Sequence, residues 1–411
     1  MSLSGFDMEM YANAVAYMSR ISRLYSTSSQ AYIVYRFVEK LFCATTGADD
    51  LASQDISFDA KKGDLGFGIK TFVATSGNVI KREKIAEFTK DASNGEFAHL
   101  DHEALAHRVA HFRNARVSSD AAEIGITTAD NLYHCLVRVP GHAFVHEEPY
   151  DLIDIGNISP ISMSGAALES FPQKTEGTVY FTDGKNSYQF ITAKNTLVKS
   201  FDLTSSFVSQ TIATPIDDSI WAEVLGSKPL GLPNLTFDAN SDVENETITP
   251  DEVILPLYST RSKDLRDVPL KSGINQWNAG GRARTFGEAY IPVPSQVHKV
   301  RGNFFPPRDT KFTLNLPNGQ KVSAKICQDN SKALMSDPND ELCRWLFSTI
   351  DGSWAEAQSR LIESRPYTYD DLLEIGKDSV RVWRDLKTGE YFMRSAPTGS
   401  YEKFLEADTP N

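Results

Sequence analysis

The stretch Asp55-Ile-Ser-Phe-Asp-Ala-Lys-Lys-Gly-Asp-Leu-Gly-Phe-Gly-Ile-Lys-Thr-Phe72 decides the fold of the N-terminal half. Apolar and polar side chains alternate on both sides of Lys62-Gly63-Asp64, a polar turn that contains glycine. Two segments of period two around such a turn predict a β-hairpin. The hairpin carries a carboxylate, Asp59, on one strand and an ammonium group, Lys70, on the next. This pair suits a metal-dependent phosphodiesterase, in which the carboxylate binds a divalent ion that activates water and the lysine offsets phosphate charge.

A helical segment precedes the hairpin. Apolar residues recur at steps of three and four within residues 7–44, which predicts a core-facing helical stripe. Glu39 lies near the end of this segment. It is either a third group of the metal site or a solvated helix residue, and the pattern does not separate the two readings.

The length of 411 residues predicts two domains. Residues 236–252 contain six acids and no base, with little apolar pattern, so we place an interdomain linker at 238–252. The expected domains are therefore 1–237 and 253–411. Within them the sequence predicts a helix over 81–87, strands between 131 and 203, and a strand-rich segment over 312–400 with helices near 340–347 and 368–376.

Composition excludes several classes of protein. No run approaches the roughly 18 apolar residues of a membrane span, and the first residues lack the basic and apolar regions of a signal peptide, so we expect a cytoplasmic protein without membrane contact. The four cysteines lie far apart and form no Cys-x-x-Cys pair. They predict reduced thiols and neither a zinc site nor a disulfide framework.

The net charge of −12 argues against nucleic acid unless one region carries the binding. Residues 261–311 are such a region, because they contain ten Lys and Arg against four Asp and Glu. This local excess is typical of a phosphate-facing surface. It is interleaved with side chains able to read base edges or pack on sugars: Asn275, Gln276, Trp277, Asn278 and Tyr290.

Several blocks in the second half resemble, in order, the B3-like DNA-recognition domain of NgoFVII-type restriction endonucleases. The blocks are Ser272–Pro294, Asn303–Pro306 and Gln328–Leu334, within a resemblance that covers roughly residues 250–400. It implies a mainly-β pseudobarrel with two arms that grip the major groove, at about Asn275–Arg284 and Asn330–Cys343. The residues expected to contact DNA are Lys271, Asn275, Gln276, Trp277, Asn278, Arg282, Arg284, Asn330 and Lys332. Among these, Asn275, Arg282 and Arg284 suit base edges, and Lys271 and Lys332 suit phosphates.

The first half resembles the PD-(D/E)XK nuclease core, an α/β (α+β) fold with a mixed central sheet. The resemblance implies that Asp59 and Glu39 hold Mg²⁺ and that Lys70 is catalytic. The chain departs from the family where an acid is expected two residues before the lysine, because that position is Gly68. Either another acid completes the site (Glu39, Glu83 or Glu87), or the motif is Asp59-Ala-Lys61 with an earlier acid at 49, 50 or 55. No His-x-Lys motif of the phospholipase-D type occurs.

The two resemblances together predict a type II restriction endonuclease, a magnesium-dependent hydrolase that cuts double-stranded DNA at a specific site. A homodimer would allow such an enzyme to cut both strands. Three alternatives stay open at this point. They are a nuclease that senses a methylated base, a DNA-binding protein whose nuclease half has decayed, and a hydrolase of small phosphoesters with an unrelated β domain.

Overall fold

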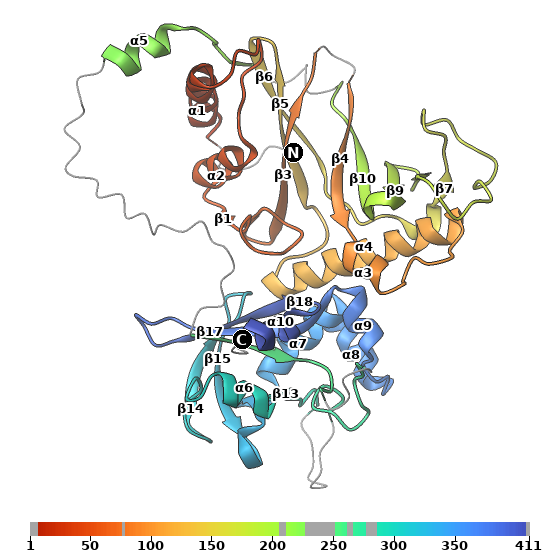
Figure 1. Ribbon diagram of the computed structural model, residues 1–411, viewed down its shortest axis with the longest axis vertical. Coiled ribbons are helices and arrows are strands. Elements are labelled where there is room, and N and C mark those ends of the chain that lie inside the picture. Colours follow the sequence, from red (N-terminus) through yellow and green to blue (C-terminus); the bar gives the residue numbers. More distant parts are fainter. Residues whose placement is uncertain are drawn as a thin grey trace. The chain divides into compact units, whose positions relative to one another are not determined.

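The computed structural model describes residues 7–75, 79–204, 211–226, 251–260, 266–276 and 286–407. The chain divides into two compact units, and each is discontinuous in sequence (Figure 1). The N-terminal unit comprises Met1–Glu87, Asp101–Ala106 and Ala129–Asn245. The C-terminal unit comprises Phe88–Leu100, His107–Thr128 and Glu246–Asn411.

A six-stranded mixed sheet forms the centre of the N-terminal unit. Its order is β1 (Asp49–Asp50), β2 (Ala60–Lys62), β3 (Leu65–Val73), β5 (Leu132–Val139), β6 (His142–Pro149) and β11 (Thr211–Ala213). Strands β3 and β5 pair in parallel and the other neighbours are antiparallel. Parallel strands need a crossover connection, and here the chain leaves β3 at Val73 and enters β5 at Leu132, 59 positions later. The predicted hairpin and mixed sheet are therefore present.

Helices α1 (Met8–Ile21) and α2 (Tyr35–Thr46) cover one face of this sheet (Figure 1). Tyr11 and Val15 of α1 and Phe42 of α2 pack with Phe67 and Ile69 of β3 in one core. The predicted helical segment is confirmed in two parts, separated by a short 3-10 helix (Ser22–Leu24) and the extended chain that follows it. A further helix, α5 (Ser219–Gly226), follows β11.

A second, antiparallel sheet completes the N-terminal unit. Its order is β4 (Ile80–Glu87), β10 (Thr196–Asp202), β9 (Ser187–Ile191), β8 (Val179–Thr182) and β7 (Ser159–Pro160). The prediction of a helix over 81–87 is wrong. These mostly charged residues favour a helix by propensity, but six of them, together with Ile80, pair with β10. Ladder pairing overrides the propensity. The turn that contains Asp183-Gly184 joins β8 and β9, and Gly184 has a φ of 84°.

The C-terminal unit contains a seven-stranded sheet that is nearly closed into a barrel. Its order is β12 (Glu252–Pro256), β17 (Lys377–Arg384), β18 (Tyr391–Pro397), β14 (Lys311–Asn315), β15 (Lys321–Cys327), β16 (Ala333–Ser336) and β13 (Ile291–Pro292). The end strands β12 and β13 lie next to each other. This confirms the expected barrel-like β domain. Helices pack around it: α3 (Thr89–Ser93), α6 (Ser295–Val300), α7 (Glu341–Asp351), α8 (Trp354–Ile362), α9 (Tyr369–Glu374) and α10 (Ser400–Ala407).

Helix α4 (His102–Ile124) lies within the range 1–237 that the sequence assigns to the N-terminal domain. Residues 107–128 nevertheless belong to the C-terminal unit. Lys377 at the start of β17 is buried and contacts Asp120 at 2.6 Å and Glu123 at 2.6 Å, both on α4. Most of the expected linker lies outside the described residues, and its last residue, Glu252, begins β12. Within the described part of the chain, no helix is both long and apolar enough to cross a membrane.

Candidate active site and nucleic-acid interface

Asp59 lies against β3. Its backbone N–H donates to the carbonyl of Phe67 at 2.8 Å, and its carboxylate Oδ2 accepts a hydrogen bond from the N–H of Ile69 at 2.6 Å. The side chain of Asp59 is therefore held at the backbone of Ile69, the residue that precedes Lys70 on β3. This explains how a carboxylate and a lysine eleven positions apart in sequence come together.

Glu39 of α2 joins them. Its side chain is buried, with one oxygen 2.9 Å from Nη1 of Arg36. Burial is the main reason that the pKa of Glu39 is raised, and the negative charge of Asp59 raises it further, while Arg36 and Lys70 act in the opposite direction. The three residues predicted from sequence as catalytic therefore lie close enough to influence one another electrostatically. Their catalytic role stays a prediction.

Steric contact with two tyrosines explains why position 68 is glycine and not an acid. A Cβ atom at this position would lie 2.8 Å from Tyr133 and 2.9 Å from Tyr150, closer than carbon atoms approach. The two tyrosine rings stack with centroids 4.3 Å apart, and the Tyr150 hydroxyl donates to the carbonyl of Ser57. An aromatic pair thus fills the space that an acid at position 68 would need.

The other acids considered as replacements lie elsewhere. Glu83 and Glu87 are on β4 of the second sheet, and Glu87 pairs with Lys84 at 3.0 Å. Asp50 forms an ion pair with Lys40, and Asp49 lies opposite Lys61 in the β1–β2 ladder. Glu87 and Asp50 therefore each have a lysine partner of their own.

Glu39 and Asp59 fit a Mg²⁺ ion that also binds a DNA phosphate. Among the residues that the structure describes, no three His, Cys, Asp or Glu side chains come together as a complete metal cage. Mg²⁺ commonly takes only one or two carboxylates and completes its shell with water and phosphate oxygens. The raised pKa of Glu39 is consistent with an acid pair that lacks full positive compensation.

Sequence reasoning missed a charged pair that joins the two sheets of the N-terminal unit. Lys199 of β10 is buried, and its ammonium group donates a hydrogen bond to Glu148 of β6. The other carboxylate oxygen of Glu148 lies 3.0 Å from Nε2 of His146. Burial raises the pKa of the Cys135 thiol, and charges of Glu148, Lys70 and Lys199 also act on it, so Lys70 and the Glu148–Lys199 pair both lie near Cys135. No local pattern marks the Glu148–Lys199 pair, because its partners are 51 positions apart.

In the C-terminal unit, the described part of the predicted first arm is its root. Trp277, Asn278, Arg282 and Arg284 lie outside the described residues. The Asn275 amide nitrogen donates to the carbonyls of Pro269 at 3.1 Å and Tyr367 at 3.0 Å, and its oxygen accepts from the Tyr367 N–H at 2.7 Å. These bonds give Asn275 a structural role at the root of the arm.

Three further predicted DNA contacts, Lys271, Asn330 and Lys332, are exposed, and Gln276 is half-buried. Lys271 lies just before the root of the first arm. Asn330 and Lys332 lie in the turn between β15 and β16, where Gln328, Asn330 and Ser331 all have positive φ values. This turn therefore presents Asn330 and Lys332 to solvent, as a DNA contact requires.

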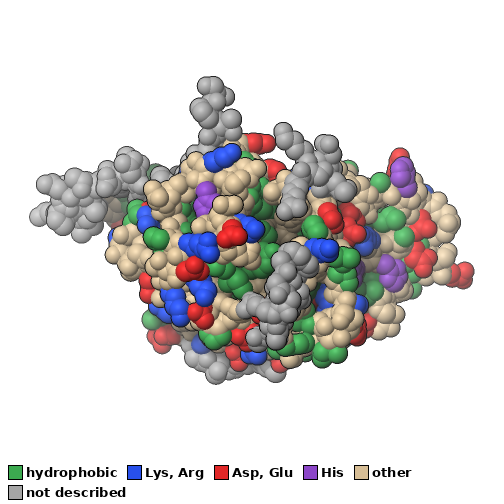
Figure 2. All heavy atoms as spheres, turned by 90° about the horizontal axis from the view of Figure 1, so that it is seen from below, with side chains coloured by type: hydrophobic (Ala, Val, Ile, Leu, Met, Phe, Trp, Pro, Cys, Tyr) green, Lys and Arg blue, Asp and Glu red, His purple; other side chains and the backbone are tan. Residues whose placement is uncertain are grey.

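The basic excess of residues 261–311 is partly neutralised by ion pairs. Arg308 lies 3.2 Å from Asp309 and 3.4 Å from Asp329, and Lys311 lies 2.8 Å from Asp337. Figure 2 shows a face on which Lys and Arg groups are interspersed with Asp and Glu groups. Phosphate binding would therefore depend on a few unpaired cations.

Comparison with known proteins gives one result. Residues 256–384 match the sequence model of the NgoFVII C-terminal B3-like DNA-binding domain. No curated protein matches the chain. The match includes strands β13 to β17 of the barrel-like sheet and ends before β18. It supports a DNA-binding domain of the restriction-enzyme type, with DNA as the partner of this unit.

Proposed function

We propose that the protein is a site-specific endonuclease of the type II restriction class, which hydrolyses double-stranded DNA in its N-terminal unit and reads sequence with its C-terminal unit. The observation that carries the proposal is the match of residues 256–384 to a DNA-binding domain of a restriction-enzyme family. The proximity of Glu39, Asp59 and Lys70 supports the catalytic half.

The chain's own residues divide the work. Mg²⁺, when bound, would supply Lewis-acid activation of water and neutralise phosphate charge. Asp59 and Glu39 would hold it, because each carboxylate is already oriented, Asp59 by the Ile69 N–H and Glu39 by Arg36. The Lys70 ammonium would orient the attacking water by a hydrogen bond and stabilise the negative charge that develops on the phosphate.

The test is cleavage of phage DNA with and without Mg²⁺, followed by sequencing of the fragment ends. Asp59→Asn and Lys70→Met should each lower the cleavage rate by about 10²–10³-fold. Asp64→Asn is the matched control, because Asp64 is an exposed acid in the same hairpin. Both catalytic variants should still bind DNA in a gel-shift assay.

A DNA-binding protein without nuclease activity is the second candidate, and Gly68 is the observation that favours it. It predicts DNA binding with no cleavage of any DNA at any Mg²⁺ concentration. Digestion of methylated and unmethylated plasmids side by side separates sequence-specific cleavage from cleavage that needs a modified base. Sedimentation of the protein with its cleaved DNA site tests the proposed homodimer.

A further inference from the structure

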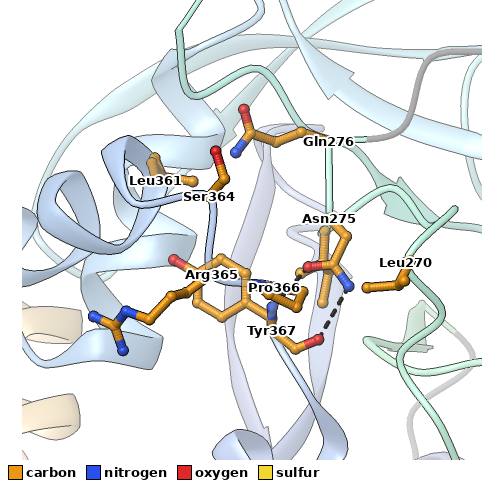
Figure 3. Close-up of a pocket in the computed structure, with 9 residues that line it drawn as sticks. Leu270, Asn275, Gln276, Leu361, Ser364, Arg365, Pro366 and Tyr367 are labelled. Atoms are coloured by element: carbon orange, nitrogen blue, oxygen red, sulfur yellow. Dashed lines mark hydrogen bonds between the residues drawn. The ribbon is translucent and has the colours of Figure 1, made fainter.

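A pocket of about 340 Å³ lies at the root of the first arm in the C-terminal unit. Gln276 and Ser364 line one side of it, and Leu270, Leu361 and Pro366 contribute apolar surface (Figure 3). The volume lies within the range of small-ligand sites, which are roughly 300–1,000 Å³. The pocket combines polar groups with apolar side chains, as small-ligand sites do.

Gln276 and Ser364 both adopt a left-handed backbone conformation, with φ values of 56° and 57°. This region is unfavourable for residues with a Cβ atom other than Asn and Asp. Figure 3 shows the Gln276 amide and the Ser364 hydroxyl pointing toward one another at the edge of the pocket. Within the described residues, neither side chain forms a hydrogen bond with another protein group. Two strained residues therefore present unused polar groups to one cavity.

The surrounding bonds hold this arrangement in place. Asn275 ties the loop to the backbone of Tyr367, and the Gln276 N–H donates to the carbonyl of Gly273 at 3.1 Å. Gly273 admits no side chain, because a Cβ atom there would lie 2.3 Å from the carbonyl oxygen of Tyr290. Backbone strain that is held this firmly is typical of functional sites.

The occupant must protrude from DNA. A base that stays in the stack presents its edge in a groove and is read by side chains that project into that groove. It cannot enter a concave pocket. A base rotated out of the duplex can, and such bases are read by hydrogen bonds to their edges and by contact of their faces with apolar or aromatic side chains.

We infer that this pocket receives a nucleobase extruded from bound DNA, with Gln276 and Ser364 bonding to its edge and Leu270, Leu361 and Pro366 contacting its faces. The Gln276 amide offers a donor and an acceptor side by side, which complements adenine well. The inference rests on DNA binding by the C-terminal unit and does not depend on cleavage by the N-terminal unit.

The test uses the full chain without divalent metal. A preferred duplex is first selected from a random pool, and its base pairs are then replaced one at a time by mismatches. Mismatched bases are cheaper to extrude, so one position should bind about tenfold more tightly or better, while mismatches elsewhere in the site weaken binding. The adenine analogue 2-aminopurine, placed at that position, should increase in fluorescence on binding, because leaving the base stack relieves quenching.

Gln276→Gly and Ser364→Gly remove the polar groups and relieve the backbone strain together. Both variants should keep or raise the Tm. They should lose the tighter binding of the mismatched duplex and the rise in 2-aminopurine fluorescence. Asn303→Gly is the matched control, because Asn303 also has a positive φ (64°), is exposed and lies outside the pocket. It should change neither.

The outcomes separate this inference from the proposed function. The protein could bind the selected duplex tightly, with no position at which a mismatch strengthens binding and no rise in fluorescence. This result would refute base extrusion and would remain consistent with DNA recognition by the C-terminal unit. A fluorescence rise that both glycine variants retain also overturns it, because the base then leaves the stack for another site. Absence of any DNA binding overturns both ideas.

Discussion

Replacing Lys377 by methionine should destabilise the C-terminal unit strongly. The Lys377 ammonium lies 2.6 Å from Asp120 and 2.6 Å from Glu123, and all three side chains are nearly fully buried. Burial alone would lower the pKa of Lys377, but the charges of Asp120 and Glu123 outweigh it and raise the pKa. Methionine keeps most of the side-chain volume and removes the charge, so two acids are left buried without their cation.

The cost follows from the partners that remain. Removal of one member of a buried ion pair usually costs about 3–5 kcal/mol. Glu123 keeps hydrogen bonds from the Ser395 N–H at 2.8 Å and from the Ser395 hydroxyl, so part of its compensation survives. We therefore expect a loss of about 3 kcal/mol, at the lower end of that range. For a unit of this size that is a fall in Tm of roughly 6–12 °C.

Urea unfolding at neutral pH, followed by tryptophan fluorescence, measures the loss. Trp345 is a suitable reporter, because its indole N–H donates to the Glu123 carbonyl at 3.2 Å. Lys387→Met is the control, since Lys387 is exposed and should change stability by at most about 0.5 kcal/mol. The reasoning is refuted if Lys377→Met costs less than about 1 kcal/mol, or if adding Glu123→Gln makes the loss larger instead of smaller.

Three further predictions concern other parts of the chain. Gly68→Asp should lower stability by about 1–3 kcal/mol and fail to raise cleavage, because the new side chain overlaps Tyr133 and Tyr150; urea unfolding and a plasmid cleavage assay check it. Burial raises the pKa of Asp378 to about 6, above its ordinary value of 3.8, so its contribution to stability is present at pH values below 3.8 and is lost as the pH rises to about 6. Unfolding at a series of pH values should show that Asp378→Asn removes a fall of about 3 kcal/mol across this window. A fragment of residues 246–411 lacks α4, so Lys377 would be buried without Asp120 and Glu123. Circular dichroism should show that this fragment is poorly folded and that the fragment 88–411 is folded.

The local parts of the candidate site were predictable from sequence, because they depend on neighbours in the chain. Asp59 and Lys70 belong to one hairpin, and the hairpin follows from alternating side chains around a glycine turn. Glu39 precedes it on a helix that packs on the same sheet. Alternation likewise revealed most strands of the barrel, since each buries one face.

The parts that sequence reasoning missed depend on residues far apart. The β4 strand reads as a helix because Lys81 to Glu87 are good helix formers, and only pairing with β10, more than a hundred positions later, makes it a strand. The reason for Gly68 is equally remote, because Tyr133 and Tyr150 fill its space. The pocket between Gln276 and Ser364 joins two loops 88 positions apart, and neither carries a motif.

Helix α4 changes what the division into a reading unit and a cutting unit means. A single acidic linker at 238–252 implies two halves that are joined once and fold separately. The chain instead passes from one unit to the other at residues 87–88, 100–101, 106–107, 128–129 and 245–246. The segment 107–128 contributes the acids that neutralise Lys377, and the chain then continues directly into β5, the parallel neighbour of the strand that carries Lys70. Because folding of the C-terminal unit needs a segment that lies between β3 and β5, loss of that segment should disrupt both units. The two units are therefore encoded as interleaved segments, and a fragment meant to contain the folded C-terminal unit must include residues 88–128.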